Sequence, residues 1–419
     1  TLVIFIQGDN GASAEGGPQG LHSEESMING FPESFEYLQK HIDELGGPRT
    51  RNHMPAAWAW ALNTPFQYYK QVASHAGGVR NGLVISWPGR IVEGQKMRSP
   101  FLHVSDIAPT ILEAAKVPVP KKLNGVEQMP LDGISFAYTF KQPEAPGKRQ
   151  TQVFEVMQNL GIYHDGWTAG TRPVAAPWEI ITKSLDVDVN ERQWELYNIA
   201  TDFSQSKDLA TQNPEKLKQL KDMFFDIAGK NNILPIHGIS EGAGGRPSLL
   251  AGHNILRFTQ RATRIPEPAA PRTIGRSFNI IAKVIVPEDG ANGVLVTQGG
   301  RFGGYSFYLK DGVPRFHYNA IGERQDLVRA SSAVPAGTHD LKAQFVIDKP
   351  VPGSGGTLTL FVDGKQVGAG RIENTIRAWF SMNDGFDIGE DTLTPISDDY
   401  TIENSRFNGE IKEVLLDLK

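Results

Sequence analysis

The spacing of hydrophobic residues changes once along this chain and divides it into two kinds of structure. In the first 236 residues, unbroken apolar runs such as 2–6 and 83–87 are interspersed with stretches whose apolar residues recur every three or four positions, such as 107–115 and 217–227. Unbroken runs are typical of strands buried on both faces, and the second spacing is typical of amphipathic helices. The pattern predicts an α/β domain over residues 1–236.

From residue 276 onward, apolar and polar residues alternate, as they do along half-buried strands. Short alternating segments occupy residues 277–286, 293–298, 305–310, 315–318, 339–347, 357–362, 386–388 and 411–417. They are separated by turn sequences that include Asp311-Gly312, Asp363-Gly364 and Asn408-Gly409. This pattern predicts an all-β sandwich of the jelly-roll kind over residues 276–419.

Three other stretches give weaker signals. Residues 237–275 contain few periodic apolar positions and several Gly, Pro and Arg, so we predict a linker that wraps over the surface. Residues 14–50 are interpreted as an insertion over the active-site face, with a helix near 31–45 and with His22 as an exposed loop histidine. The aromatic residues of 53–70 are expected to fill a core rather than to form the wall of a cleft.

Length and composition exclude several classes of protein. At 419 residues the chain is long enough for two or more domains, and its net charge of −5, with both signs well mixed, gives no basic surface for nucleic acid. No apolar run approaches the roughly 20 residues that cross a bilayer, so no membrane span is expected. The absence of cysteine excludes disulfides and thiolate metal sites and leaves the cellular compartment open.

The clearest candidate chemistry follows the first apolar run. Gly8 ends this run, and Asp9 and Asn10 then offer a carboxylate and an amide oxygen side by side. Ligands are commonly bound at the carboxyl ends of strands in α/β sheets, and hard oxygen ligands suit Ca²⁺ or Mg²⁺. The structural alternative is an ordinary Asx turn, because Asp-Asn-Gly is also turn chemistry.

Six motifs in sequence order give the first part of the chain a family resemblance. They are GDNGA at 8–12, SHAGGVRNGLVISWPG at 74–89, VSDIAPTIL at 104–112, LDGIS at 131–135, GIYHDGW at 161–167 and WELYN at 194–198. Together they resemble the second half of a sulfatase of the alkaline-phosphatase-like superfamily, especially the large bacterial arylsulfatases. The later Gly-rich region is similar to the C-terminal extension of the same enzymes.

The resemblance implies a metal-assisted hydrolysis of sulfate esters, with Asp9 and Asn10 as two metal ligands and Ca²⁺ or Mg²⁺ as the cation. It also implies that Lys70 binds the sulfate and stabilises the leaving oxygen, with His75 as the second catalytic candidate. Judged without the family, Lys70 would be a solvated surface lysine. Asp106 is interpreted as a structural helix cap, Arg80 as a residue that fixes a turn, and His164-Asp165 as part of a tight turn.

One part of the family pattern is missing. Sulfatases of this kind use a formylglycine nucleophile, made from the Cys or Ser of a Cys/Ser-x-Pro/Ala-x-Arg motif, and no such motif with its usual sequence context occurs here. The early Asp metal ligands of the family are absent too. We therefore expect this chain to be the C-terminal portion of a larger enzyme, whose N-terminal half supplies the nucleophile, and we expect residues 1–419 alone to be inactive.

The sequence leaves two other functions open. The related fold also carries phosphatases and phosphodiesterases, and the C-terminal sandwich, which resembles concanavalin-like and laminin-G-like modules, could bind carbohydrate. An acidic cluster at Asp384, Asp387, Asp391 and Asp398-Asp399 could hold Ca²⁺ or simply be solvated. The natural substrate, a small-molecule or glycan sulfate ester, is not identified by the sequence.

Overall fold

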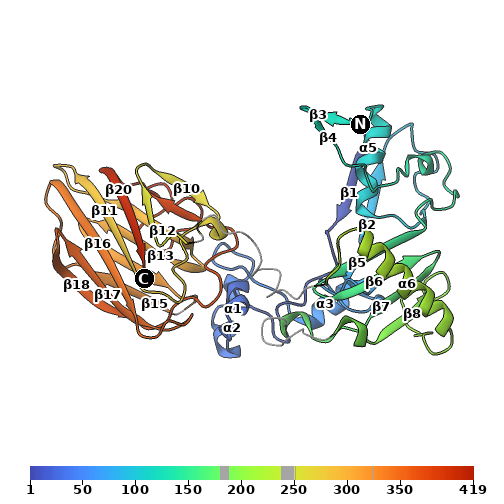
Figure 1. Ribbon diagram of the computed structural model, residues 1–419, viewed down its shortest axis with the longest axis horizontal. Helices are drawn as coiled ribbons and strands as arrows, with labels where there is room; N and C mark the ends of the chain where they lie inside the picture. Colours follow the sequence, from blue (N-terminus) through green and yellow to red (C-terminus); the bar gives the residue numbers. More distant parts are fainter. Residues whose placement is uncertain (180–187, 237–249, 251, 323) are drawn as a thin grey trace. The chain divides into compact units, whose positions relative to one another are not determined.

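The computed structural model describes residues 1–179, 188–236, 250, 252–322 and 324–419, which form two compact units (Figure 1). Unit 1 consists of Thr1–Ala14 and the described part of Ala56–Gly244. Unit 2 consists of Glu15–Pro55 and the described part of Gly245–Lys419. The segment that we interpreted as an insertion over the active-site face thus belongs to the same unit as the β-rich C-terminal region. Residues 237–249 and 251 of the predicted linker lie outside the described residues.

A four-stranded antiparallel sheet and one long helix form the main core of unit 1 (Figure 1). Strands β5 (Thr151–Val156), β6 (Asn159–His164), β7 (Trp167–Thr171) and β8 (Trp194–Asn198) pair in chain order. Helix α6 (Pro214–Lys230) has proline in its first turn, and it buries Leu220, Phe224 and Ala228 against the sheet. The amphipathic helix predicted from residue 214 is confirmed.

The first strand differs from its prediction. Strand β1 (Val3–Gln7) pairs antiparallel with β2 (Gly82–Ser86) in a sheet of two strands. Both strands were expected to be buried on both faces, yet Phe5 is 56% exposed and Val84 is 64% exposed. The prediction of burial is therefore wrong for the described residues, because a sheet of two strands leaves most of its apolar side chains uncovered.

The remaining elements of unit 1 are short. They are the helices α3 (Ala56–Asn63), α4 (Ala76–Val79) and α5 (Ile107–Ala115), the 3₁₀ turns η2 (Val104–Asp106), η3 (Ala137–Phe140), η4 (Pro177–Glu179) and η5 (Val189–Glu191), and the strands β3 (Lys122–Leu123) and β4 (Val126–Glu127). Asp106 is buried at the N-cap position of α5 but forms no side-chain cap hydrogen bond with this helix. Its carboxylate instead accepts hydrogen bonds from the backbone N–H groups of His103 and Ile134, so its role is structural but differs from the predicted helix cap. None of the helices that the structure describes has the length and apolar character needed to span a bilayer.

Two six-stranded antiparallel sheets form unit 2 (Figure 1). One sheet has the order β10-β19-β12-β13-β14-β15 and the other has the order β18-β17-β16-β11-β20-β9. The strands are β9 (Ile255–Phe258), β10 (Ala262–Ile265), β11 (Phe278–Val286), β12 (Gly293–Gly300), β13 (Gly303–Lys310), β14 (Val313–Asn319), β15 (Gln325–Arg329), β16 (Gly337–Ile347), β17 (Gly356–Val362), β18 (Lys365–Ile372), β19 (Phe386–Ile388) and β20 (Glu410–Leu418), and a 3₁₀ turn η6 (Glu267–Ala269) follows β10. Buried side chains from both sheets form the main apolar cluster, and Val294, Tyr308 and Tyr400 form a small second one, so this part of the chain is an all-β structure with its main core built from both sheets.

The eight strands predicted from alternation are all present, and four strands were missed. The missed strands are β9, β10, β15 and β18, each at or near the edge of a sheet. Strands β9 and β10 lie in the range predicted as a linker, but they pair with β20 and β19. Two of the predicted hairpin turns are formed as expected, with positive φ at Asp311-Gly312 and at Asp363-Gly364.

The segment Glu15–Pro55 packs on the β-rich part of unit 2. It contains α1 (Glu24–Ile28), α2 (Phe35–Lys40) and the 3₁₀ turn η1 (Ile42–Glu44), which replace the continuous helix predicted near 31–45. Phe31 is buried in the core of unit 2, and the guanidinium of Arg377 lies 4.5 Å from its ring centroid. The side-chain oxygen of Asn29 accepts hydrogen bonds from the backbone N–H groups of residues 377, 378 and 379. This polar contact fixes the segment to the loop before β19.

Candidate functional site

The loop after β1 brings the predicted metal ligands next to the segment that carries Lys70. Gly8 has a φ of 80°, which ends the strand, and the N–H of Gly11 donates to the carbonyl oxygen of Gly78 at 3.1 Å. A Cβ at Gly11 would lie 1.7 Å from the carbonyl oxygen of Gly77, so only glycine fits this approach. The backbone N–H of Lys70 donates to the carbonyl oxygen of Ala12, also at 3.1 Å.

Asp9 and Asn10 lie at the surface of this loop. Asp9 is exposed and Asn10 is partly buried, in the two positions directly after Gly8. Among the residues that the structure describes, no hydrogen bond or ion pair engages the Asp9 carboxylate. An exposed carboxylate beside an amide oxygen suits a hard cation such as Ca²⁺ or Mg²⁺, so these two residues fit the predicted role.

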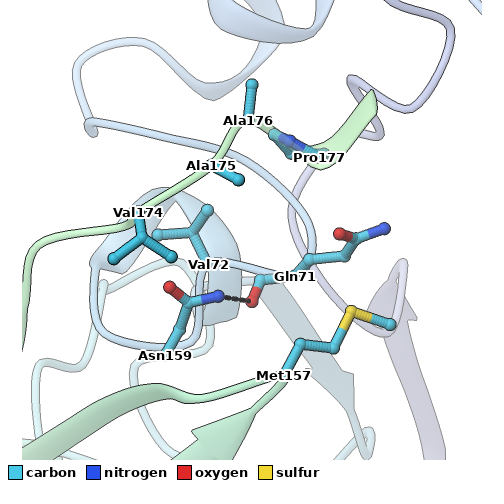
Figure 2. A pocket seen from close by; sticks show the side chains of 8 residues that line it. All are labelled: Gln71, Val72, Met157, Asn159, Val174, Ala175, Ala176 and Pro177. Carbon is cyan, nitrogen blue, oxygen red and sulfur yellow. Dashed lines mark hydrogen bonds between the residues drawn. The ribbon is translucent and has the colours of Figure 1, made fainter. Parts of the chain in front are cut away.

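The backbone on either side of Lys70 is held in an unusual conformation. Tyr68 and Gln71 both have positive φ, 65° and 78°, a region that residues with a side chain rarely adopt. The side chain of Asn159, at the start of β6, donates to the carbonyl oxygen of Gln71 at 3.0 Å (Figure 2). Asn159 therefore fixes the residue that follows Lys70, and Lys70 itself is partly buried.

The same hydrogen bond lies in the wall of a pocket in unit 1 (Figure 2). Gln71 and Val72 form one side of this pocket, Met157 and Asn159 form another, and the segment 174–177 closes it. Figure 2 shows the Asn159 amide directed at the Gln71 carbonyl. The pocket is thus a place where three segments of unit 1 support the backbone next to Lys70.

His75 lies in the interior of unit 1. It is 1% exposed, with Nδ1 2.9 Å from Ser74 Oγ and Nε2 2.9 Å from Glu195 Oε2. Its ring also packs against Tyr68, with ring centroids 4.5 Å apart. Because both ring nitrogens are engaged inside the protein, the geometry favours a positioning role for His75 over direct contact with a substrate.

Glu195 is the buried charge that holds this region together. Its second carboxylate oxygen, Oε1, accepts from Arg172 Nε at 2.8 Å, and Tyr197 donates to Oε2 at 3.2 Å. The hydrogen bonds from His75 and Arg172 lower the pKa of Glu195 to about 2 in spite of its burial. Glu195 was not predicted as a site residue, although a carboxylate between Trp194 and Leu196 in a buried strand must have a partner.

Two neighbouring predictions did not hold in full. The aromatic residues of 53–70 fill a core only in part, since Tyr69 packs against a small buried cluster but Trp58 is 64% exposed and Trp60 is 45% exposed. The guanidinium of Arg80, expected to fix a turn by hydrogen bonds, lies over the rings of Phe66 and Phe203, 4.9 Å and 4.2 Å from their centroids. These contacts place Arg80 between two aromatic side chains of unit 1.

The acidic cluster of unit 2 has structural partners. Asp384, Asp387 and Asp391 are buried, and each accepts hydrogen bonds from its own loop or from an adjacent one. Burial raises the pKa of Asp391 to about 7, although the hydroxyl of Tyr400 donates to its carboxylate at 2.8 Å. These groups brace the loops around β19, which favours the structural interpretation over a Ca²⁺ site.

The part of the chain that carries Asp9 and Lys70 matches a known protein family. The family described as Sulfatase matches residues 1–117. The N-terminal part of the chain is a sulfatase domain. Its homologues include an arylsulfatase of Klebsiella aerogenes, 29% identical over 137 residues that make up 33% of this chain and 27% of the arylsulfatase.

A second curated relative is also a sulfatase. An uncharacterized sulfatase of Schizosaccharomyces pombe (strain 972 / ATCC 24843) is 24% identical over 249 residues, which are 58% of this chain and 41% of the yeast protein. The chain therefore spans less than half the length of these two curated relatives. A solved structure from work on glycosaminoglycan metabolism by Bacteroides thetaiotaomicron is 18% identical, covers 43% of this chain and 36% of its own, and has a TM-score of 0.32, a likeness too distant to bear on substrate.

The sulfatase domain also contains a short sequence with the spacing of a formylglycine motif. Ser86-Trp87-Pro88-Gly89-Arg90 has the bare Ser-x-Pro-x-Arg spacing of a formylglycine site. It lies at the exposed end of β2, and the backbone N–H of Arg90 closes a turn onto Trp87 at 3.0 Å. A turn rather than a helix follows the strand, so this sequence lacks the strand-to-helix context expected of the nucleophile.

Proposed function

We propose that unit 1 is the C-terminal part of the catalytic domain of an arylsulfatase-like enzyme that hydrolyses sulfate esters. The observation that carries the proposal is the pair of backbone hydrogen bonds from Gly11 to Gly78 and from Lys70 to Ala12. They join two loops that are about 60 residues apart and that carry Asp9, Asn10 and Lys70. Both loops fall inside the stretch that matches the sulfatase family.

In this proposal Asp9 and Asn10 hold a hard cation, Ca²⁺ or Mg²⁺, through one carboxylate oxygen and one amide oxygen. A bound cation of this kind supplies positive charge to the sulfate oxygens and to the attacking oxygen. The turn at Gly8 and the close approach of Gly11 to Gly77 keep the two ligands at the edge of the β1 strand. Their exposure leaves room for ligands from elsewhere in the enzyme.

The ammonium of Lys70 binds a sulfate oxygen and stabilises the negative charge that develops on the leaving alcohol or phenol oxygen. The strained backbone at Tyr68 and Gln71, and the hydrogen bond from Asn159, set the position from which Lys70 acts. His75 orients this segment through its contacts with Ser74 and Glu195. A small-molecule or glycan sulfate ester is the substrate class.

The nucleophile, a formylglycine hydrate, comes from an N-terminal half of the same enzyme. The support is an uncovered apolar surface on unit 1, where Phe5 and Val84 are exposed on the two-stranded sheet. Beside it lies an open groove of about 340 Å³ that is lined by six apolar residues: Leu2, Ile4, Trp87, Ile111, Ala114 and Ala115. Burying this surface against further strands of a larger sheet would make β1 and β2 the interior strands that their sequences predict.

Kinetics of Lys70→Ala in the protein combined with its nucleophile-bearing half test this function. The exposed Lys141 gives a matched control, Lys141→Ala, which should leave turnover unchanged. Loss of Lys70 should lower kcat/KM for an aryl sulfate by roughly 100-fold or more, with a larger effect for poorer leaving groups. Equal activity of the two variants would refute the role of Lys70, and sulfate release by residues 1–419 alone that disappears in Ser86→Ala would refute the need for a second half.

A further inference from the structure

A second cluster of potential metal ligands lies in unit 2, in the segment Glu15–Pro55. His22 follows the bridge that pairs Leu21 with His53, His41 separates α2 from η1, and Glu44 is the last residue of η1. One ligand atom from each of His22, His41 and Glu44 lies within 4.8 Å of the other two. The exposed loop position predicted for His22 is wrong, since His22 is only 7% exposed.

Two distances in this cluster are of the size found between neighbouring ligands of a zinc ion, with each histidine facing a different carboxylate oxygen of Glu44. His22 Nε2 lies 3.3 Å from Glu44 Oε2, and His41 Nδ1 lies 3.4 Å from Glu44 Oε1. Ligand atoms at about 2.0–2.1 Å from a tetrahedral Zn²⁺ are separated by about 3.3–3.4 Å along each edge. Charge-assisted hydrogen bonds between imidazolium and carboxylate are shorter, about 2.7–2.9 Å, so the contacts are loose for ion pairs and suitable for a shared cation.

The chemical nature of His22, His41 and Glu44 also suits a zinc ion. Nδ1 of His41 faces Glu44, and Nε2 on the other side of the ring is buried with no hydrogen-bond partner among the residues that the structure describes. Two imidazoles and one carboxylate form a ligand set that zinc enzymes use, with a fourth position left for water.

A bound cation would stabilise the segment around α2 and η1, which has few buried apolar side chains. The rings of His22 and His41 both pack against Tyr37, with centroids 5.4 Å and 4.6 Å from it. Neither α2 nor η1 contains a buried residue, and Phe35 and Ile42 are more than half exposed. Few apolar contacts therefore hold this segment, while the backbone N–H of His22 is fixed by Glu33 at 2.6 Å.

We propose that His22, His41 and Glu44 bind one divalent cation of the zinc class, which fastens the α2–η1 segment to the part of unit 2 that carries His22. This site is separate in ligand chemistry from the Asp9–Asn10 pair, because nitrogen ligands select Zn²⁺ over Ca²⁺ and Mg²⁺. It is independent of the proposed hydrolytic function. Occupation stabilises unit 2, since a ligand that binds the folded state alone raises the unfolding temperature.

Zinc and cobalt binding by residues 1–419 test the site. The chain should be treated with a chelator, loaded with Zn²⁺ and dialysed, after which it should retain one equivalent of Zn²⁺. Co²⁺ loaded in place of Zn²⁺ should give the intense visible bands of tetrahedral coordination. The variants His41→Gln and Glu44→Gln change partly exposed residues and should weaken Zn²⁺ binding at least about tenfold. The control His339→Gln removes an imidazole that contacts one carboxylate, Asp363, at 2.7 Å, and should bind Zn²⁺ as the parent does.

Three outcomes would overturn the proposal. One is the absence of stoichiometric Zn²⁺ in the parent chain, another is an octahedral Co²⁺ spectrum, and the third is equal Zn²⁺ affinity in His41→Gln, Glu44→Gln and the parent. The unfolding temperature gives a second readout in case a variant folds poorly. It should rise with Zn²⁺ in the parent and in His339→Gln but not in the two ligand variants.

Discussion

The substitution of Glu195 tests whether its buried carboxylate stabilises the contacts between β8 and the segment that carries His75. The substitution Glu195→Gln keeps the shape of the side chain and removes its charge. In the parent, that charge accepts hydrogen bonds from His75, Arg172 and Tyr197. The glutamine cannot satisfy all three partners as an anion does, so the contacts between β8, β7 and the His75 segment should weaken.

The structure sets the size of this effect. The pKa of Glu195, about 2, lies about 2.5 pH units below its ordinary value of 4.5, which corresponds to about 3 kcal/mol of preference for the ionised form in the folded state. The Arg172 side chain is 54% exposed, so solvent screens part of its share. We expect Glu195→Gln to lower the free energy of unfolding of unit 1 by about 2–3 kcal/mol at pH 7.

The pH dependence makes the test specific. Because folding lowers the pKa of Glu195, its contribution is present at neutral pH and is lost as the pH falls through 4.5 toward about 2. The difference between parent and variant should therefore shrink between pH 7 and pH 3. Guanidinium unfolding, with hydrogen exchange of β6 to β8 as the local probe, measures it at each pH.

A matched control is Glu191→Gln, which changes an exposed carboxylate just before β8 in the sequence. This variant should unfold within about 0.5 kcal/mol of the parent at every pH. A loss of less than about 0.5 kcal/mol in the free energy of unfolding of Glu195→Gln at pH 7 would refute the stabilising role of the carboxylate. A loss in Glu195→Gln that is the same at pH 3 as at pH 7 would also contradict this role.

Three further predictions concern other parts of the chain. Asn159→Ala removes the donor to the Gln71 carbonyl, so turnover of a sulfate ester by the complete enzyme should fall about 10-fold or more while the unfolding temperature stays nearly constant; an unchanged kcat would contradict this. Burial raises the pKa of Asp391 to about 7, so its contribution to unit 2 is lost as the pH rises from about 4 through 7, and Asp391→Asn should flatten that decline in thermal melts; an unchanged pH profile would argue against it. Phe5→Lys should leave the stability of residues 1–419 within about 0.5 kcal/mol but abolish co-purification with the nucleophile-bearing half, and intact co-purification would exclude β1 from that interface.

The sequence was most informative where a strand has one buried face. All eight strands predicted in unit 2 are present because alternation and Asp-Gly turns report a half-buried hairpin directly. Strand β18 was missed because Gly368 and Gly370 interrupt its pattern. The structure explains these glycines, since a Cβ at Gly370 would lie 2.7 Å from Val328 of β15, where the edges of the two sheets meet.

The sequence was less informative where burial depends on partners far along the chain. The apolar run of β1 predicted an interior strand, but the described residues cover it with β2 alone, so local pattern could not reveal the exposed face of Phe5. The sequence did place Asp9 and Asn10 directly after a strand. The proximity of Lys70 followed only from the family resemblance, and the contact between His75 and Glu195 joins residues 120 positions apart.

The most direct test of the account is the hydrolysis of matched aryl sulfate and aryl phosphate esters by the protein combined with its nucleophile-bearing half, before and after Asp9→Ala. We expect the parent to prefer the sulfate ester and Asp9→Ala to lower this activity at least about 100-fold, with the fold of unit 1 unchanged because Asp9 is exposed. A preference for the phosphate ester, or full sulfate hydrolysis by Asp9→Ala, would contradict it.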